Sequence, residues 1–273
     1  MDKAKIHGHD LEYSVTGAKS EKWVVFIHGS VFEDMFVPLM SHPALSDYSI
    51  LHFHRRGYGK SNYDRSKPPT INELSDDCLD LMKFLNIDCA HIVSHSYAGL
   101  IALQAAVDEP RRIQSLTLME PPLAAFVPDG AEFGKKLENS LSLYHEGKKF
   151  ESLDSFLKVV FEGTKDYRKI IDSQLGSKAF DNALSILDTM FQLEFPALLK
   201  WKFDPKNTKS MIMPILSVRG TDSSIFFQQI HLLLQSWFPH LETLVIPNSS
   251  HILHMQSPDL VANGLASFFS RHC

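Results

Sequence analysis

Short runs of mostly apolar, β-branched residues, each ending in a turn, constrain the fold of this chain more than any other feature. Successive apolar positions are typical of a strand that is buried on both faces of a sheet. Segments with helical spacing separate the runs, for example residues 71–85 and 97–107. This alternation predicts an α/β protein with a mostly parallel sheet covered by helices on both faces. The expected strands are 23–27, 49–53, 90–94, 113–119, 213–218 and 243–246, after a hairpin at 5–13.

The pattern changes between residues 122 and 205. Apolar residues there keep helical spacing, as at Leu137, Leu141 and Tyr144, and no run of β-type residues occurs. We therefore expect a core domain formed by residues 1–121 and 206–273, interrupted by a helical cap subdomain at 122–205. Ligands of such sheets bind beyond the carboxyl ends of the strands, so the cap should lie over that edge.

Composition excludes several classes of protein. The chain has 27 basic and 32 acidic side chains, a net charge of −5, which argues against a nucleic-acid partner. Its longest apolar runs are far shorter than the ~20 residues of a membrane-spanning helix, and the polar start predicts no signal peptide. Cys78, Cys89 and Cys273 form no CxxC pair, so a reducing compartment is expected. We expect a cytoplasmic protein, monomeric or homodimeric.

The segment Ser94-His95-Ser96-Tyr97-Ala98-Gly99 lies where a predicted strand meets a predicted helix. Small residues on both sides of a serine at such a junction are typical of a nucleophile elbow, in which a tight turn exposes the hydroxyl. Ser96 would then project from a helix N-terminus, whose positive end favours a developing anion. A serine that merely caps an ordinary helix is the alternative.

Four features in this order resemble the α/β-hydrolase superfamily, in its form with a helical cap. They are His28-Gly29 after a strand, the turn Arg56-Gly57-Tyr58-Gly59-Lys60-Ser61, the Ser96 elbow and a late histidine, His251. The resemblance covers essentially the whole chain and implies the α/β-hydrolase fold. The family usually has Asp two residues before the arginine of the second motif, and this chain has His54 there.

The resemblance implies that His251 is the catalytic base, because the family histidine follows the last strand. It would take the proton of Ser96 and deliver it to the leaving group. His254, three residues later, is the rival.

The fourteen histidines do not predict a metal site. The HExxH motif is missing, and the pairs His7/His9 and His52/His54 are expected to lack further ligands. We expect neither a metal nor a cofactor.

Two backbone N–H groups are needed to stabilise the oxyanion. The resemblance implies that one belongs to Tyr97, which follows the nucleophile, and the other to Ser30, with Gly29 allowing the turn.

The third member of the triad has two candidates. The usual acid of the family lies three residues after the glycine that follows the strand at 213–218, but that position is Ser223, and Asp222 is one residue early. Glu120 ends the preceding strand, where some branches of the superfamily, including zearalenone-type lactone hydrolases, have their acid. We prefer Glu120 and keep Asp222 as the alternative; either would hold the imidazole tautomer.

The cap is rich in aromatic residues, some of which should form its own core and some the pocket wall. We expect substrate contacts from Phe32, Phe126, Phe191 and Trp201. The leading function is a serine hydrolase that cleaves a small-molecule carboxylic ester or lactone with an apolar or aromatic moiety, through an acyl-enzyme. The alternatives are a C–C bond hydrolase, a cofactor-free dioxygenase with a similar Ser-His-Ser elbow, and a receptor-like member that binds without turnover.

Overall fold

The computed structural model describes residues 1–272, so Cys273 lies outside the described residues. The described residues form eight strands: β1 (Asp2–Ile6), β2 (His9–Gly17), β3 (Trp23–Ile27), β4 (Ser49–Phe53), β5 (Ala90–His95), β6 (Ile113–Met119), β7 (Ile215–Gly220) and β8 (Glu242–Ile246). Each predicted strand is confirmed to within two residues, because a continuous apolar run marks both of its ends. The predicted hairpin is longer than expected, since it extends from residue 2 to residue 17.

The strands form one sheet in the order β1-β2-β4-β3-β5-β6-β7-β8. All neighbours from β4 to β8 are parallel, whereas β1 and β2 add an antiparallel hairpin beside β4. The central strands β3, β5 and β6 are almost completely buried. The expected mostly parallel sheet is confirmed.

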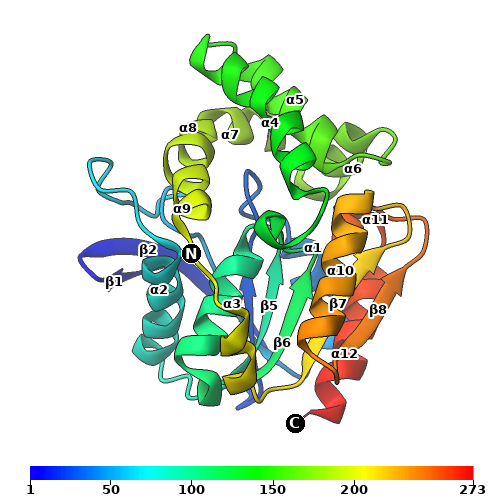
Figure 1. Ribbon diagram of the computed structural model, residues 1–273. Coiled ribbons are helices and arrows are strands. Elements are labelled where there is room, and N and C mark those ends of the chain that lie inside the picture. The colour runs from blue at the N-terminus through cyan, green and yellow to red at the C-terminus, as the bar shows by residue number, and fades with distance from the viewer. Residues whose placement is uncertain (273) are drawn as a thin grey trace.

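Helices cover both faces of this sheet. In Figure 1, α2, α3 and α10 lie on one face and α12 on the other, where it packs against α1. The bounds are α1 (Val37–Met40), α2 (Ile71–Phe84), α3 (Ala98–Asp108), α10 (Ile225–Trp237), α11 (Leu253–Gln256) and α12 (Pro258–Arg271). Thr70 and Glu73 form the capping box at the start of α2. No helix among residues 1–272 combines the length and apolarity needed to cross a bilayer.

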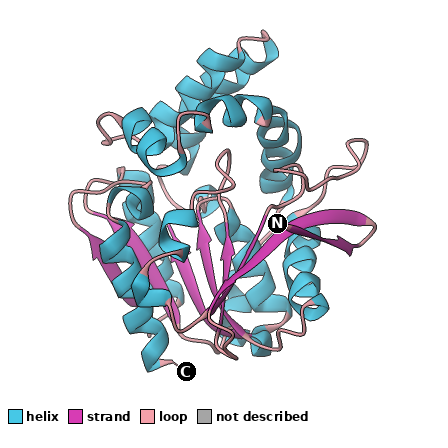
Figure 2. Ribbon diagram, turned by 180° about the vertical axis from the view of Figure 1, so that it is seen from behind, coloured by secondary structure: helices cyan, strands magenta, loops and turns pink. Residues whose placement is uncertain are grey.

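Six further helices and a π-helical turn connect β6 to β7. They are α4 (Gly130–His145), α5 (Lys149–Val160), α6 (Tyr167–Leu175), α7 (Ala179–Ser185), α8 (Leu187–Thr189), the π-helix Met190–Glu194 and α9 (Phe195–Lys200). Figures 1 and 2 show them together above the edge of the sheet at which the parallel strands end. The residues that follow the carboxyl ends of β3, β5, β6 and β7 therefore lie on the side of the sheet where these helices are.

Candidate active site

Ser96 lies in a strained turn between β5 and α3. Its φ of 52° is in the left-handed region, which costs a residue other than glycine roughly 1–3 kcal/mol. Its N–H donates to Met119 O (2.9 Å), and its carbonyl accepts from Gly99 N (2.8 Å). A Cβ on Gly99 would lie 2.5 Å from Pro121 Cβ, so only glycine fits there. The local geometry is that expected of the elbow, with a partly exposed serine at its tip.

His251 and Glu120 form a buried pair. His251 Nδ1 lies 2.8 Å from Glu120 Oε2, and both side chains are at most 3% exposed. The other oxygen, Glu120 Oε1, accepts from Gly220 N (3.1 Å) and from Ser223 Oγ. Because the carboxylate holds Nδ1–H, the lone pair of the neutral ring is on Nε2, where a general base needs it. The backbone of Glu120 has a left-handed φ of 50°, and this conformation turns the chain at the end of β6.

Asp222 lies outside this pair. It is exposed, and its carboxylate accepts from the neighbouring Thr221 Oγ1 (2.8 Å). Its backbone N–H donates to Ser249 O (2.9 Å). Within residues 1–272 the structure gives it no contact with His251, so only Glu120 meets the expected base.

Three rings surround His251. Phe227 stacks on it, with centroids 4.1 Å apart and planes at 11°, and Phe161 of the inserted helices lies 6.2 Å away. The ring of His95, the residue before Ser96, lies 4.6 Å from it, and His95 Nε2 donates to His251 O (2.7 Å). Burial, with His254 and His251 nearby, holds the pKa of His95 well below its usual value. Neutral His95 therefore ties the elbow to the loop that carries His251.

His254, the rival base, is enclosed. Both ring nitrogens lack a hydrogen-bond partner among the described residues, and its ring lies 4.5 Å from His95. Burial and the nearby His251 lower its pKa to about 3. It has no carboxylate to orient it, unlike His251.

The expected oxyanion donors are free. Neither Ser30 N nor Tyr97 N donates a hydrogen bond to another residue of the described chain. A Cβ on Gly29 would lie 2.8 Å from His95 Nδ1 and 3.4 Å from Ser96 Cβ, so the loop passes close to the elbow. Free N–H groups beside the nucleophile are what an oxyanion hole requires.

A buried hydrogen-bond network, which the sequence did not predict, supports the loop of residues 28–31. Arg55 donates to His28 O (3.0 Å), to Gly29 O (2.8 Å) and to Glu194 Oε1 (2.6 Å). Tyr58 OH donates to the same Glu194 oxygen (2.9 Å) and accepts from Val31 N (3.1 Å). Burial alone would lower the pKa of Arg55, but the Glu194 carboxylate together with Tyr58 and Tyr97 outweighs it, so this pKa is raised.

The aromatic residues expected to contact substrate have diverse surroundings. Phe32 packs edge-on against Phe180 of α7 (6.1 Å), and Phe191 stacks on Tyr144 (4.5 Å). Phe126 packs against Trp237 of α10. Trp201 Nε1 donates to Gln104 Oε1 (2.9 Å). Rings contacting His251 come instead from Phe227 and Phe161, whose role no local sequence signal marks.

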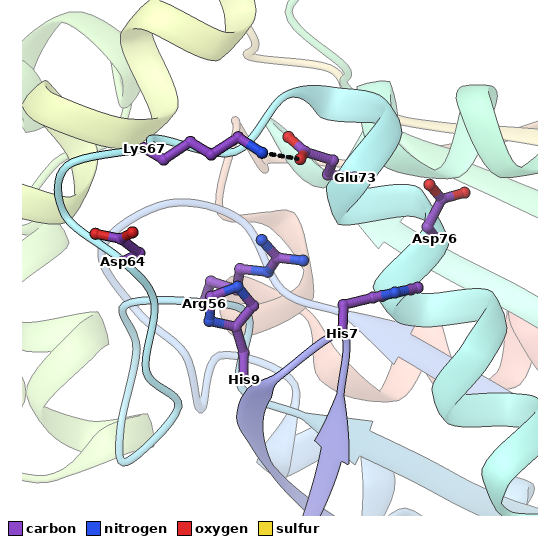
Figure 3. Close-up of a pocket in the computed structure, with 7 residues that line it drawn as sticks. All are labelled: His7, His9, Arg56, Asp64, Lys67, Glu73 and Asp76. Atoms are coloured by element: carbon purple, nitrogen blue, oxygen red, sulfur yellow. Dashed lines mark ion pairs between the residues drawn. The ribbon is translucent and has the colours of Figure 1, made fainter.

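One cavity of about 260 Å³ lies away from these residues. Figure 3 shows it between the N-terminal hairpin, the turn at Arg56 and α2, lined by His7, His9, Arg56, Asp64, Lys67, Glu73 and Asp76. None of the expected catalytic residues lines it.

The expectation that His52 and His54 have no further ligand nearby is wrong. One ring nitrogen of each and a carboxylate oxygen of Asp34 lie within 4.8 Å of one another. Asp34 is 18 residues earlier in the sequence, on the loop after β3, so sequence proximity could not reveal the cluster.

The family model for the alpha/beta hydrolase fold matches residues 22–258. A probable lysophospholipase of Arabidopsis thaliana is 34% identical over 43% of this chain and 26% of its own length, so this chain matches only a part of that relative. A carboxylesterase of Bacillus subtilis is 21% identical over 93% of this chain and 82% of its own.

Among solved structures, the enol-lactonase from Burkholderia xenovorans LB400 superposes with a TM-score of 0.79. The superposition covers 98% of this chain and 100% of that one, at 19% identity. A likeness at this identity shows a common fold.

Proposed function

This chain belongs to the alpha/beta hydrolase fold family, and we propose that it is a serine hydrolase of carboxylic esters or lactones. The observation that carries the proposal is the buried hydrogen bond from His251 Nδ1 to Glu120, beside an elbow that exposes Ser96. The similarity to a carboxylesterase and to the fold of an enol-lactonase supports the same class of substrate.

In the proposed reaction, His251 Nε2 takes the proton of Ser96 as its oxygen attacks the acyl carbon. Ser30 N–H and Tyr97 N–H stabilise the oxyanion, and the imidazolium is stabilised by Glu120. His251 then protonates the leaving alcohol, which in a lactone stays attached to the acyl group. Water, activated by the same histidine, releases Ser96 and the acid.

The helices of residues 122–205 would act as a cap over this site. Phe161 near His251 and Phe180 against Phe32 support an apolar wall from the cap side. Such a wall favours an apolar or aromatic acyl or ring moiety. We further propose that the substrate is a small molecule and that the protein works in the cytoplasm as a monomer or homodimer.

The test combines turnover with covalent labelling. The purified protein is mixed with an aryl short-chain ester, an aryl-substituted lactone and, separately, a fluorophosphonate probe. We expect hydrolysis and one adduct per chain, on Ser96, both lost in Ser96→Ala. Ser94→Ala is the matched control: Ser94 lies in the same elbow, and its Oγ only donates to Thr117 O (3.0 Å).

Retained turnover and labelling in Ser94→Ala would show that the loss in Ser96→Ala is chemical. No adduct and no hydrolysis in the wild type would contradict the proposal. Oxygen uptake with an aromatic hydroxyl substrate would then be measured, since in the alternative oxygenase His251 would deprotonate such a substrate.

A further inference from the structure

We propose that Asp34, His52 and His54 form a binding site for a divalent first-row transition-metal ion, with Zn²⁺ as the probe ion. The site lies where β4 ends, beside the loop after β3 that carries Ser30. It is separate from the Ser96–His251–Glu120 set and does not depend on the proposed function.

The spacing of the ligand atoms fits a metal ion. His54 Nε2 lies 3.2 Å from Asp34 Oδ1. Two ligands bound to zinc at 2.0–2.1 Å with a tetrahedral angle are about 3.3 Å apart. An ion could therefore replace the shared proton of this pair with little movement. One nitrogen of His52 completes three ligand atoms within 4.8 Å.

Each histidine is oriented as metal-binding histidines usually are. Such a ring almost always gives its other N–H to a carboxylate or a backbone carbonyl. His54 Nδ1 lies 3.0 Å from Glu12 Oε2, and His52 Nε2 lies 2.9 Å from Glu33 O. Glu12 is itself fixed, because its Oε2 also accepts from Lys60 N (2.9 Å). The outer hydrogen bond of His52 leaves its Nδ1 for an ion, whereas His54 would bind an ion through Nε2, which now contacts Asp34.

The free nitrogen of His52 is available. Because Nε2–H donates to a carbonyl, Nδ1 carries the lone pair, and it makes no hydrogen bond within residues 1–272. It is also not among the enclosed unpaired atoms of that range, in contrast to both nitrogens of His254. Asp34 is 55% exposed, which gives an ion a path to the site.

The donor set selects the class of ion. Two imidazoles and a carboxylate suit zinc and its neighbours, whereas Mg²⁺ and Ca²⁺ prefer oxygen ligands alone. Three protein ligands leave a fourth position for water. The Asp34 and Glu12 carboxylates both contact His54, and this pair of negative charges favours a cation. A bound ion would join β4 to the loop of residues 30–34.

The experiment measures Zn²⁺ binding by calorimetry on the full chain after treatment with a chelator, at pH 7.5. We expect one saturable site per chain in the wild type and no Mg²⁺ binding there. Asp34→Asn and His52→Gln should each weaken the Kd at least tenfold. His42→Gln is the matched control, because His42 Nε2 also lies 3.2 Å from a carboxylate, that of Asp259, without a third ligand.

Thermal unfolding without metal shows which variants fold, and Asp34→Asn should, since its side chain is half-exposed. Zn²⁺ should raise the Tm of the wild type and of His42→Gln, but not that of Asp34→Asn. The proposal is overturned if the wild type shows no stoichiometric site. It is also overturned if Asp34→Asn and His52→Gln bind zinc as tightly as the wild type.

Discussion

Glu120 differs from Asp222 in what fixes its carboxylate. Both oxygens of Glu120 are held, one by His251 and one by Gly220 N and Ser223 Oγ. Ser223, the position at which an acid is usual, supplies a hydroxyl that supports the substitute acid. The carboxylate of Asp222 is exposed and, within residues 1–272, accepts a hydrogen bond only from its neighbour, Thr221. A fixed acceptor loses less freedom when the imidazolium forms.

Glu120→Gln should lower kcat on an aryl ester by about 10³–10⁴-fold, because an amide stabilises neither the required tautomer nor the imidazolium. Asp222→Asn should lower it less than about threefold, since the exposed side chain contacts no catalytic residue. Steady-state kinetics of the two variants provide the comparison. A larger loss in Asp222→Asn would identify Asp222 as the acid and contradict our choice.

The sequence alone named both acids, and it favoured Glu120 only through a resemblance to some branches of the superfamily. The choice depends on where β6 and β7 end relative to the loop that carries His251, which is a matter of tertiary position. Ser96 was easier to identify from the sequence as a candidate nucleophile, because its turn requires small residues close by, at Ser94, Ala98 and Gly99. The roles of Phe227 and Phe161 could not be foreseen, since an aromatic residue at helical spacing fits a core equally well.

The π-helix Met190–Glu194 links the inserted helices to the core through a buried ion pair. π-helical turns are rare and often occur at functional sites. This one buries Glu194 against Arg55, which in turn holds the carbonyls of His28 and Gly29. Arg55 Nη1 and Glu194 Oε2 are enclosed without partners within the described chain. The pair therefore positions the loop of Ser30 at a cost in desolvation.

Glu194→Gln should lower the free energy of unfolding by about 3–5 kcal/mol, because it leaves the Arg55 charge buried and unpaired. The double variant Arg55→Met/Glu194→Met should recover most of that loss. Glu162→Gln breaks an exposed cap pair with Lys136 (3.3 Å) and should cost at most about 1 kcal/mol. Urea denaturation measures all three variants.

Equal losses in Glu194→Gln and Glu162→Gln would contradict the role of the buried pair. So would a double variant that is no more stable than Glu194→Gln.

The bounds of helices and strands could be predicted from the sequence where the apolar pattern alone determined them. The helix at 71–85 is confirmed to within one residue and the strand at 113–119 at both ends, because the apolar pattern ends abruptly there. The antiparallel place of β1 and β2 beside β4 was not predicted, since hairpins carry no signal of which sheet edge they join. The contact of Arg55 with Glu194 spans 139 residues and leaves no local pattern.

At the scale of the whole molecule, buried neutral histidines dominate the response to acid. Burial is the main cause in every case: it lowers the pKa of His91 to about 4 and that of His254 to about 3. It holds those of His28 and His95 well below their usual value. In the unfolded chain these rings take up protons near pH 6.5. The unfolded state therefore binds more protons below that pH, and stability falls as pH falls.

We expect the free energy of unfolding to be nearly constant from pH 8 to 7 and to drop steeply between pH 6.5 and 5. Each such histidine contributes up to about 1.4 kcal/mol per pH unit. His54, whose pKa is raised by Asp34 against the effect of burial, acts in the opposite direction. It is one group against six other buried histidines, because burial also lowers the pKa of His52 and that of His231. Urea denaturation at half-unit pH intervals gives the curve, and His91→Gln should flatten it. A flat curve down to pH 5 would contradict the assignment.

The bond between Glu120 and His251 spans 131 residues, and this separation sets the order in which the chain becomes competent during synthesis. The strands from β3 to β6 and the turn of Ser96 leave the ribosome first and can begin to fold. The inserted helices, which follow Glu120 in the sequence, are synthesised next. His251 emerges only after β8. Under the proposed function, a nascent chain therefore carries its nucleophile, Ser96, long before its base, and it stays inactive until His251 has emerged.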